Sequence, residues 1–402
     1  MSAPVGRVLV TDGARSSALA MIRSLGRAGW HVIAADVEGH SPGLSSTFAA
    51  RRLRYTSPQQ DAGQFVDDLV AETARNPVDL LIPVTDNAIL PLANARERFG
   101  PATNLAIPKN YALELARDKL RTVTLAQDLG VPVPATVFAS TAAEAMAVLR
   151  DMGPPVVLKP RFSRQLIYNR VVSSQVSYAF DAAGVARAFD EALAPGGFLV
   201  QDYTPGTGVG VELLVEEGKP LLMFQHRRIR EVPLTGGPSS LRESVALDPV
   251  LFGYAAAILG RMQWTGLAMV EFKLTQDGPR LMEVNGRPWG SLPLAVACGI
   301  DFPAAMAHLL TRRGAPPVPT TYPIGVRQRS LELELAWIAA AVRRHDDSRL
   351  GVTTGTSPWR VLVSLPASLS EFDTYEPYDV RPLAVEILHI GELIWRRIRH
   401  SA

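Results

Sequence analysis

The sequence predicts a parallel α/β domain at the N-terminus, followed by an α+β region built on antiparallel sheets. Three observations predict this fold class. Over residues 1–115, short apolar strands alternate with helical stretches. From Phe198 onward, strands are separated by glycine turns instead. The chain is 47% hydrophobic and 20% charged, a composition that can bury a large core.

The charge balance and the cysteine content limit which binding partners and which cellular compartment we expect for this protein. The 402 residues include 41 Lys and Arg against 39 Asp and Glu, a net charge of +2, which removes the strongest reason to expect a nucleic-acid or anionic-membrane partner. The lone cysteine, Cys298, excludes an intrachain disulfide framework and favours a reducing compartment. No apolar run approaches the roughly 18 residues of a membrane span. We expect a soluble cytoplasmic protein.

Residues 1–115 are predicted to begin with a β-strand, an α-helix and a second β-strand, and to continue with further strands. Val8–Val10 is a buried strand, and apolar residues recur at helical spacing over 18–28. His31–Asp36, Asp79–Val84 and Asn104–Ile107 supply the other strands. These elements predict one parallel α/β layer.

The same opening has some parts of a dinucleotide site. It combines a strand, a glycine turn, a helix and an acidic residue, Asp36. Only Gly13 stands where the G-x-G-x-x-G fingerprint needs three glycines, so we favour a scaffold or substrate-side role. An NAD-linked oxidoreductase stays a distant alternative.

The second region is predicted over residues 116–311, and a C-terminal linker and mixed helical segment over 312–402. A helix over 142–149 leads to the strand Val156–Lys159. Four later segments predict one antiparallel sheet; they are Phe198–Gln201, Val211–Val215, Leu221–Phe224 and a strand pair near 267–285. A proline-rich linker follows at Ala315–Pro319.

The strand pair near 267–285 is the most informative stretch. A turn at Gln276-Asp277-Gly278 makes it a hairpin and places Glu271 opposite Glu283, unless a bulge shifts the register by one residue. Side chains alternate along a strand, so each strand presents three of them on one face; these are Met269, Glu271 and Lys273, and Leu281, Glu283 and Asn285.

Two facing carboxylates repel each other unless something positive lies between them. Glu271, Glu283 and the Asn285 carbonyl offer only hard oxygen ligands, which suit Mg²⁺ completed by phosphate oxygens and water. An exposed hairpin face with solvated charges is the alternative. A glycosidase acid/base pair is a further alternative, against which the neighbouring positive charges argue.

Basic residues recur at positions that suit an anionic ligand. Lys159 ends an apolar strand, where it either has an anionic partner or extends to solvent. Lys119 is weaker evidence, because a charged helix start usually faces solvent. His226, Arg228 and Arg230 share a strand face before the glycine-containing loop 233–240, which suits phosphate or carboxylate. Salt-bridged surface arginines are the alternative reading.

The segment Gln201-Asp202-Tyr203 connects strands and could present backbone donor and acceptor groups to an adenine edge. Taken alone it is an ordinary loop. The chain contains no G-x-x-x-x-G-K-[ST] phosphate loop and no protein-kinase motif set.

Together these residues resemble the ATP-grasp superfamily, and within it the carboxylate–amine ligases related to carbamoyl-phosphate synthetase and biotin carboxylase. Glu271 followed by Met282-Glu283-Val284-Asn285-Gly286-Arg287 is similar to the family's E…E-x-N-x-R. The segments 226–237 and 287–291 look most like predicted carboxylate–amine ligases. The resemblance covers residues 5–310.

The resemblance implies a pre-ATP-grasp domain and an ATP-grasp domain that binds ATP between subdomains near 116–200 and 201–311. It implies one or two Mg²⁺ ions, with Mn²⁺ as an alternative, held by Glu271, Glu283 and Asn285. Phosphate contacts would come from Lys159 and Lys119, and adenine contacts from Gln201, Asp202 and Tyr203. Arg287 would hold a substrate carboxylate, with Arg228 or Arg230 beside the γ-phosphate.

The implied reaction activates a carboxylate as an acyl phosphate and couples it to an amine, releasing ADP and phosphate. Amino acids are the expected kind of substrate, and a homodimer is the expected oligomer. Phosphorylation of bicarbonate and a non-catalytic nucleotide-binding protein are the alternatives. The segment 160–165 lacks the family's usual glycine-rich phosphate lid, and Arg161 and Arg164 are candidates to replace it.

Overall fold

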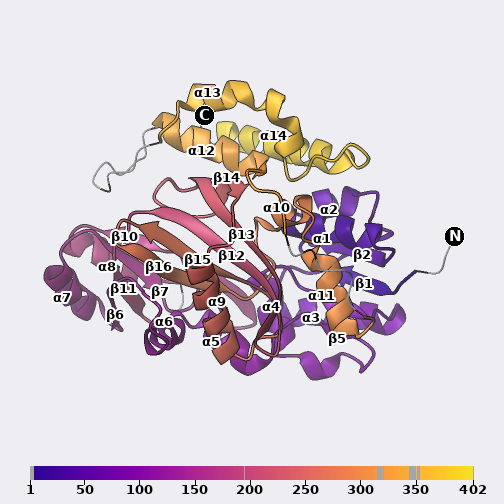
Figure 1. The fold of residues 1–402 in the computed structure, drawn as a ribbon, viewed down its shortest axis with the longest axis horizontal. Helices are drawn as coiled ribbons and strands as arrows, with labels where there is room; N and C mark the ends of the chain where they lie inside the picture. The colour runs from indigo at the N-terminus through magenta and orange to yellow at the C-terminus, as the bar shows by residue number, and fades with distance from the viewer. Residues whose placement is uncertain are drawn as a thin grey trace.

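The computed structural model describes residues 4–193, 195–314, 319, 321–343, 350 and 354–401. An N-terminal α/β domain lies against a large antiparallel sheet, a smaller sheet extends from its far side, and a layer of C-terminal helices lies across one end (Figure 1). The predicted fold class, a parallel sheet followed by antiparallel sheets, is confirmed.

The N-terminal domain is a five-stranded parallel sheet in the order β3-β2-β1-β4-β5. Its strands are β1 (Arg7–Val10), β2 (His31–Asp36), β3 (Arg51–Arg54), β4 (Leu80–Ile82) and β5 (Asn104–Leu105). Its helical segments are α1 (Ser16–Arg27), α2 (Pro42–Ser45), α3 (Ala62–Arg75), α4 (Asp86–Ala93) and η1 (Arg96–Arg98). The central strands are continuous apolar runs because both faces are covered. Sequence analysis did not identify β3, whose three arginines suit an edge strand.

The smaller sheet has the order β10-β7-β11-β6. Its strands are β6 (Thr136–Ala139), β7 (Val156–Pro160), β10 (Ser177–Ala179) and β11 (Phe198–Asp202), packed on α7 (Ala142–Met152) and α8 (Ala182–Asp190). The prediction that Phe198–Gln201 joins the later strands is therefore wrong. Phe198 and Val200 bury their side chains against α7 and α8, which fixes this strand in the smaller sheet. A separate hairpin pairs β8 (Arg164–Ile167) with β9 (Arg170–Ser173).

The large sheet has the order β16-β15-β12-β13-β14-β17. Its strands are β12 (Thr207–Glu216), β13 (Lys219–Glu231), β14 (Ser239–Ser244), β15 (Gly266–Thr275), β16 (Gly278–Asn285) and β17 (Arg327–Arg329). One face packs on α5 (Asn110–Arg117), α6 (Lys119–Asp128) and α9 (Pro249–Arg261). The other face shares an apolar core with α1, α10 (Leu292–Ala297) and α11 (Phe302–Thr311).

The register of the β15–β16 hairpin confirms the pairing of Glu271 with Glu283. A bulge follows directly, because Phe272 pairs with Leu281 and leaves Met282 as the extra residue. The bulge overturns the prediction that Leu281 shares a face with Glu283. Leu281 instead joins Phe272 in the apolar cluster under α5, α6 and α9.

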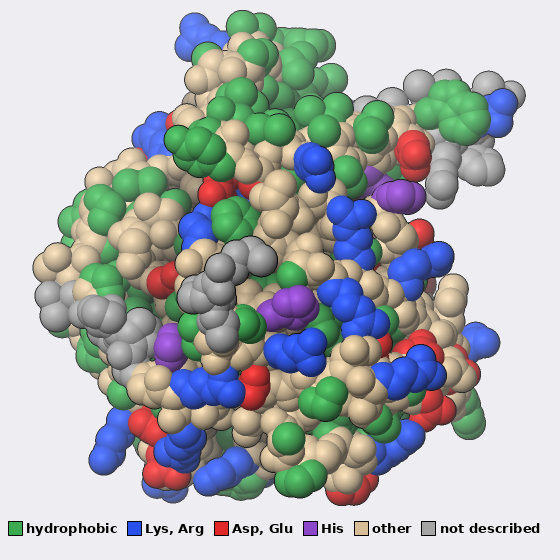
Figure 2. Space-filling model, turned by 90° about the vertical axis from the view of Figure 1, so that its right-hand side faces the viewer, with side chains coloured by type: hydrophobic (Ala, Val, Ile, Leu, Met, Phe, Trp, Pro, Cys, Tyr) green, Lys and Arg blue, Asp and Glu red, His purple; other side chains and the backbone are tan. Residues whose placement is uncertain are grey.

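The C-terminal layer contains α12 (Leu331–Arg343), α13 (Pro358–Ser364), η3 (Pro366–Glu371) and α14 (Arg381–Ser401). Figure 2 shows hydrophobic side chains gathered on the surface over these helices. Of the predicted linker at 315–319, only residue 319 lies within the described residues. No helix among the described residues is long and apolar enough to cross a membrane.

Candidate functional site

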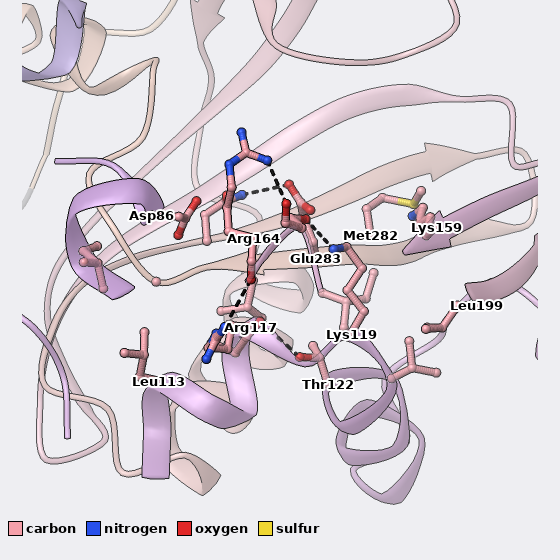
Figure 3. Close-up of a pocket in the computed structure, with 18 of the residues that line it drawn as sticks. Asp86, Leu113, Arg117, Lys119, Thr122, Lys159, Arg164, Leu199, Met282 and Glu283 are labelled. Atoms are coloured by element: carbon pink, nitrogen blue, oxygen red, sulfur yellow. Dashed lines mark hydrogen bonds between the residues drawn. The ribbon is translucent and has the colours of Figure 1, made fainter. Parts of the chain in front are cut away.

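A cavity opens where α5 and α6 face the end of β16. Charged and polar side chains from different elements converge on it (Figure 3); they include Asp86, Lys119, Lys159, Arg164, Gln201 and Glu283. Another part of the lining is apolar; it includes Leu113, Ala116, Val123, Leu199 and Leu281. The cavity therefore joins an apolar wall to a concentrated set of charges.

Glu271, Glu283 and Asn285 meet at this end of the hairpin, as predicted from their register. The Asn285 Nδ2 donates to Glu271 Oε1 at 2.7 Å and to Glu283 Oε1 at 3.1 Å. Arg287 Nη2 donates to the Asn285 Oδ1 at 3.1 Å. One amide thus links two carboxylates to a guanidinium.

The pKa values of the two carboxyl groups are shifted in opposite directions. Burial disfavours the charged form of Glu283, but Lys119, Lys159 and Arg287 outweigh it and lower the pKa of this carboxyl. Burial raises the pKa of Glu271, opposed by Arg228 and reinforced by the charge of Glu283. Glu283 is thus the more firmly ionised of the pair.

The donor set fits a magnesium ion that has other ligands besides protein. No group of three or more His, Cys, Asp or Glu side chains within the described ranges could hold a metal ion. Two carboxylates and an amide oxygen leave most of an octahedral shell to phosphate oxygens and water, which is how Mg²⁺ is usually bound beside nucleotides. Rotation of the Asn285 side-chain amide by half a turn exchanges its NH₂ group for its carbonyl oxygen, which would place that oxygen beside the two carboxylates as a ligand.

Lys119 and Lys159 line the same cavity as Glu283. Lys119 follows the N-cap Asp118 of α6, and its Nζ donates to Ser163 Oγ at 2.5 Å. Burial lowers the pKa of both ammonium groups, that of Lys159 to about 8, while the charge of Glu283 opposes the shift. Two buried ammonium groups share this carboxylate, so the cavity has capacity for further negative charge.

Arg287 follows strand β16 by two residues, and its side chain reaches the N-terminal domain. Its Nε donates to Asp86 Oδ2 at 2.7 Å, and Asp86 is the first residue of α4. Sequence analysis missed Asp86, although it follows β4 at the carboxyl end of a parallel sheet, where ligands usually bind. The N-terminal domain thus contributes a side chain to the cavity.

Of the three predicted hinge residues, only Gln201 lines the cavity. Its Nε2 donates to Thr136 Oγ1 at 2.9 Å, while its Oε1 is buried and accepts no hydrogen bond from any residue that the structure describes. Asp202 is exposed, and its backbone N–H already donates to Ala135. The Tyr203 ring packs on other side chains outside the cavity, those of Tyr178 and Lys273.

The two arginines predicted as site residues on β13, Arg228 and Arg230, point to different parts of the structure. Arg228 Nη2 lies 2.5 Å from Glu271 Oε2, so Arg228 belongs to the charged cluster. Arg230 pairs with the buried Glu334 of α12 and stacks over Trp337, so the prediction that it joins the cluster is wrong. The cause is a bulge at Ile229, which breaks the alternation of side chains between the two arginines.

The expected lid position is occupied by the β8–β9 hairpin. Arg161 binds both oxygens of Asp118, at 2.9 and 2.7 Å. Arg164 donates to Asn87 and lines the cavity, so it is the one positioned to meet an anion there. The hairpin turn at Asn169 accepts hydrogen bonds from the start of α3 in the N-terminal domain.

Comparison with protein families gives a match over residues 195–332 to the family described as ATP-grasp in the biosynthetic pathway with Ter operon. The carbamoyl phosphate synthase large chain of Xylella fastidiosa is 24% identical over 263 residues, 61% of this chain and 23% of that protein. The chain thus spans about a quarter of that relative's length. A probable alpha-L-glutamate ligase of Halorhodospira halophila is 28% identical over 214 residues, 52% of this chain and 67% of the relative.

Solved structures share the fold at low sequence identity. The ADP complex of an N5-carboxyaminoimidazole ribonucleotide synthetase superposes with a TM-score of 0.64 at 15% identity and covers 86% of each chain. The biotin carboxylase domain dimer of the Hydrogenobacter thermophilus 2-oxoglutarate carboxylase, a complex with MgADP and bicarbonate, has a TM-score of 0.63 at 13% identity. It covers 80% of this chain and 73% of that one.

Proposed function

This chain is a member of the ATP-grasp superfamily, and from that premise we propose that it is an ATP-dependent ligase that joins a carboxylate to an amine. The observation that carries the proposal is the cluster in the cavity. Two carboxylates linked by the Asn285 amide lie beside Lys119 and Lys159. The carboxylates would bind a divalent cation, the lysines would bind a polyphosphate, and the phosphate oxygens would complete the ligand shell of the cation.

The proposed reaction has two steps. A substrate carboxylate oxygen attacks the γ-phosphorus of ATP while the bond to the β-phosphate oxygen breaks, giving an acyl phosphate and ADP. The lone pair of an amine then attacks the acyl carbon, the carbon–oxygen bond to phosphate breaks, and the amine loses a proton to solvent. The products are an amide, ADP and phosphate.

The protein's part is to position groups and neutralise charge. Mg²⁺ bound by Glu271, Glu283 and Asn285 would supply charge neutralisation at the phosphates. Lys159, Lys119 and Arg164 line the same cavity and would contact phosphate oxygens. Arg287, in reach of Asn285, would hold the carboxylate as it is phosphorylated.

The base would lie against the apolar wall of the cavity. Gln201 has a buried acceptor, Oε1, without a partner, and adenine offers an amino group as donor. That Asp202 and Tyr203 contact the base stays a prediction. They would do so through their backbone groups or from the outer edge of the site. Mn²⁺ is an alternative to Mg²⁺, since both accept oxygen ligands.

A second candidate is phosphorylation of bicarbonate, favoured by the similarity to carbamoyl phosphate synthase and to a biotin carboxylase domain. In that case labelled bicarbonate enters the product, whereas the ligase incorporates none. The homodimer and the cytoplasmic location stay predictions.

The test is ADP and phosphate release by the full chain with Mg²⁺-ATP, pooled L-amino acids and pooled small carboxylates, with mass spectrometry of the mixture. Release that requires an amine and a carboxylate, with a product lighter than their sum by one water, supports the ligase. Glu283→Gln and Arg287→Ala should abolish turnover, with exposed Glu217→Gln and Arg227→Ala as matched controls. Undiminished turnover in either site variant contradicts the assigned roles, and ATP binding without turnover favours a non-catalytic protein.

A further inference from the structure

Three helices line the cavity with residues at the same helical spacing. Each contributes residues i, i+3 and i+4, which lie on one side of a helix. The three sets are Asp86, Ile89 and Leu90 of α4; Leu113, Ala116 and Arg117 of α5; and Lys119, Thr122 and Val123 of α6. Each helix thus presents one charged residue to the cavity together with two neighbours, most of which are apolar.

The cavity has two apolar parts with charged groups between them. Figure 3 shows Leu199 and Lys159 on one side of Glu283, and Asp86 and Leu113 on the other. The first part is formed by strands and is where the base of the nucleotide would lie. The second part is formed by α4 and α5. A nucleotide with its base in the first part and its phosphates at the charged centre leaves the second part to another ligand.

The second part is a helical wall that consists of Ile89, Leu90, Leu113 and Ala116. Leu90 is only 6% exposed, yet it belongs to none of the apolar clusters among the described residues. By contrast, Ile89 and Leu113 belong to the core of the N-terminal domain. The apolar surface of Leu90 therefore faces the cavity, and a ligand that covers it removes this surface from water.

The charged side chains that α4 and α5 contribute to the lining already have partners. Asp86 binds Arg287. Arg117 donates to Glu114 at 2.7 Å and to the backbone carbonyl of Arg164 at 3.1 Å. The helical wall therefore offers a ligand mainly apolar contacts.

The helical wall lies next to the residue that would hold the substrate carboxylate. Asp86, the partner of Arg287, precedes Ile89 and Leu90 by three and four residues on the same side of α4. A carboxylate held by Arg287 would therefore have the rest of its molecule beside these two apolar side chains.

The C-terminal layer is attached to a different part of the molecule. Asp373, which precedes α14, forms an ion pair with Arg242 of β14, and both side chains are buried. Every lining residue that the structure describes lies between Asp86 and Gly286. The N-terminal domain and the helices that follow it, and not the C-terminal layer, thus shape this part of the cavity.

We propose that the carboxylate substrate has an apolar body, aliphatic or aromatic, which binds against the helical wall while Arg287 holds its carboxylate. This rests on the proposed ligase function and names the chemical class of the carboxylate donor. Ligand sites are commonly built in this way, with an apolar lining and a few polar groups that fix orientation.

The first experiment measures binding without turnover. The full chain is saturated with Mg²⁺-ADP, and straight-chain monocarboxylates from acetate to octanoate are titrated by calorimetry. We expect the affinity to rise about fourfold with each added methylene until the wall is covered. Adipate has as many carbons as hexanoate but a second carboxylate at its far end. It should bind at least about tenfold more weakly, because that charge would lose water against apolar side chains.

A variant then locates the site. Leu90→Ala removes apolar surface from the wall, so hexanoate should bind at least about tenfold more weakly. The affinity for Mg²⁺-ADP should change less than about twofold. Leu221→Ala, at an exposed leucine of β13, is the matched control and should leave both affinities unchanged. Melting temperatures of the variants exclude loss of fold as the cause.

The outcomes separate this inference from the proposed function. If Mg²⁺-ADP binds but octanoate binds no better than butanoate, or adipate binds as well as hexanoate, the inference fails while the nucleotide site stands. If Leu90→Ala binds hexanoate as tightly as the unaltered chain, the acid lies elsewhere and the inference also fails. If Leu90→Ala weakens Mg²⁺-ADP instead, the wall belongs to the base. Failure to bind Mg²⁺-ADP at all overturns the proposed function itself.

Discussion

Glu271 and Glu283 face each other on adjacent strands, and the amide of Asn285 donates a hydrogen bond to each carboxylate. Facing carboxylates repel, and burial strengthens the repulsion. The raised pKa of Glu271 means that the fold disfavours its charge, whereas neighbouring cations lower the pKa of Glu283 and favour its charge. A site of this kind binds its ligand well but lowers the stability of the folded chain. Its effect on ligand binding and its effect on stability can therefore be measured separately.

Neutralising one member of the pair should have opposite effects on stability and on binding. Glu271→Gln removes the carboxyl group whose charged form is disfavoured by burial and by the charge of Glu283, so the melting temperature of the ligand-free chain should stay equal or rise. Binding of Mg²⁺-ADP should weaken at least about tenfold, because a charged ligand of the cation is lost. Calorimetric titration and thermal unfolding measure the two effects, with Glu217→Gln as the control. A variant that binds Mg²⁺-ADP normally would show that Glu271 is not a ligand.

Gly210 should tolerate no side chain. A Cβ there would lie 2.4 Å from His226 Cε1 and 2.9 Å from Met269 Sδ. Since both neighbours are buried, Gly210→Ala should cost roughly 1–3 kcal/mol in urea unfolding. Gly253→Ala, on the exposed surface of α9 with nothing within 4 Å, is the matched control and should stabilise by up to about 1 kcal/mol. Equal effects of the two changes would mean that His226 can move aside.

Arg230 should matter for stability and not for nucleotide binding. Its partner Glu334 is fully buried, so Arg230→Gln leaves a buried carboxylate short of one partner and should cost about 3–5 kcal/mol. The affinity for Mg²⁺-ADP, measured well below the melting temperature, should change less than about twofold. Arg228→Gln should also lower stability, because it removes the guanidinium that pairs with Glu271, and it should in addition weaken Mg²⁺-ADP binding. The double variant Arg230→Met/Glu334→Leu should recover stability, since neither charge is then buried alone.

Glu386 should make stability depend on pH. Burial, only partly opposed by a hydrogen bond from Thr374, raises the pKa of Glu386 from its ordinary value of 4.5 to about 7. The folded chain holds this proton at pH values where the unfolded chain has released it. The contribution to stability is therefore complete below pH 4.5 and is lost as the pH rises towards 7.

The measurement is the urea midpoint at pH values from 5 to 8 for the unaltered chain and for Glu386→Gln. The amide cannot ionise, so the variant should lose less stability over this range. Glu392→Gln, an exposed position on the same helix, should follow the unaltered chain. Parallel pH profiles for all three proteins would contradict the raised pKa of Glu386.

The metal pair could be predicted because its geometry is local. A short turn fixes the register of a hairpin, and strand alternation then fixes which side chains face each other. The position of Glu271 opposite Glu283 follows from that rule, as the structure confirms. Strand alternation does not predict the bulge at Met282, because the extra residue is stabilised by packing from other elements. The bulge places Leu281 on the other face of the strand.

The remaining site residues depend on distant parts of the chain. Arg230 was misplaced because its partner, Glu334, follows 104 residues later and a bulge turns Arg230 toward it. Asp86 approaches Arg287 from the N-terminal domain, 201 residues away along the chain. Alternation within a strand predicts a side chain's face, but it contains no information on which distant segment covers that face.

The pairing of Arg242 with Asp373 also bears on how the chain is made. Asp373 follows Arg242 by 131 residues, so at about 5–20 residues per second the ribosome adds it roughly 7–26 seconds later. Arg242 therefore gains its buried partner acid only after the C-terminal segment has been made, so this ion pair forms late in synthesis. A chain that ends before Asp373 would leave the buried Arg242 guanidinium without that carboxylate.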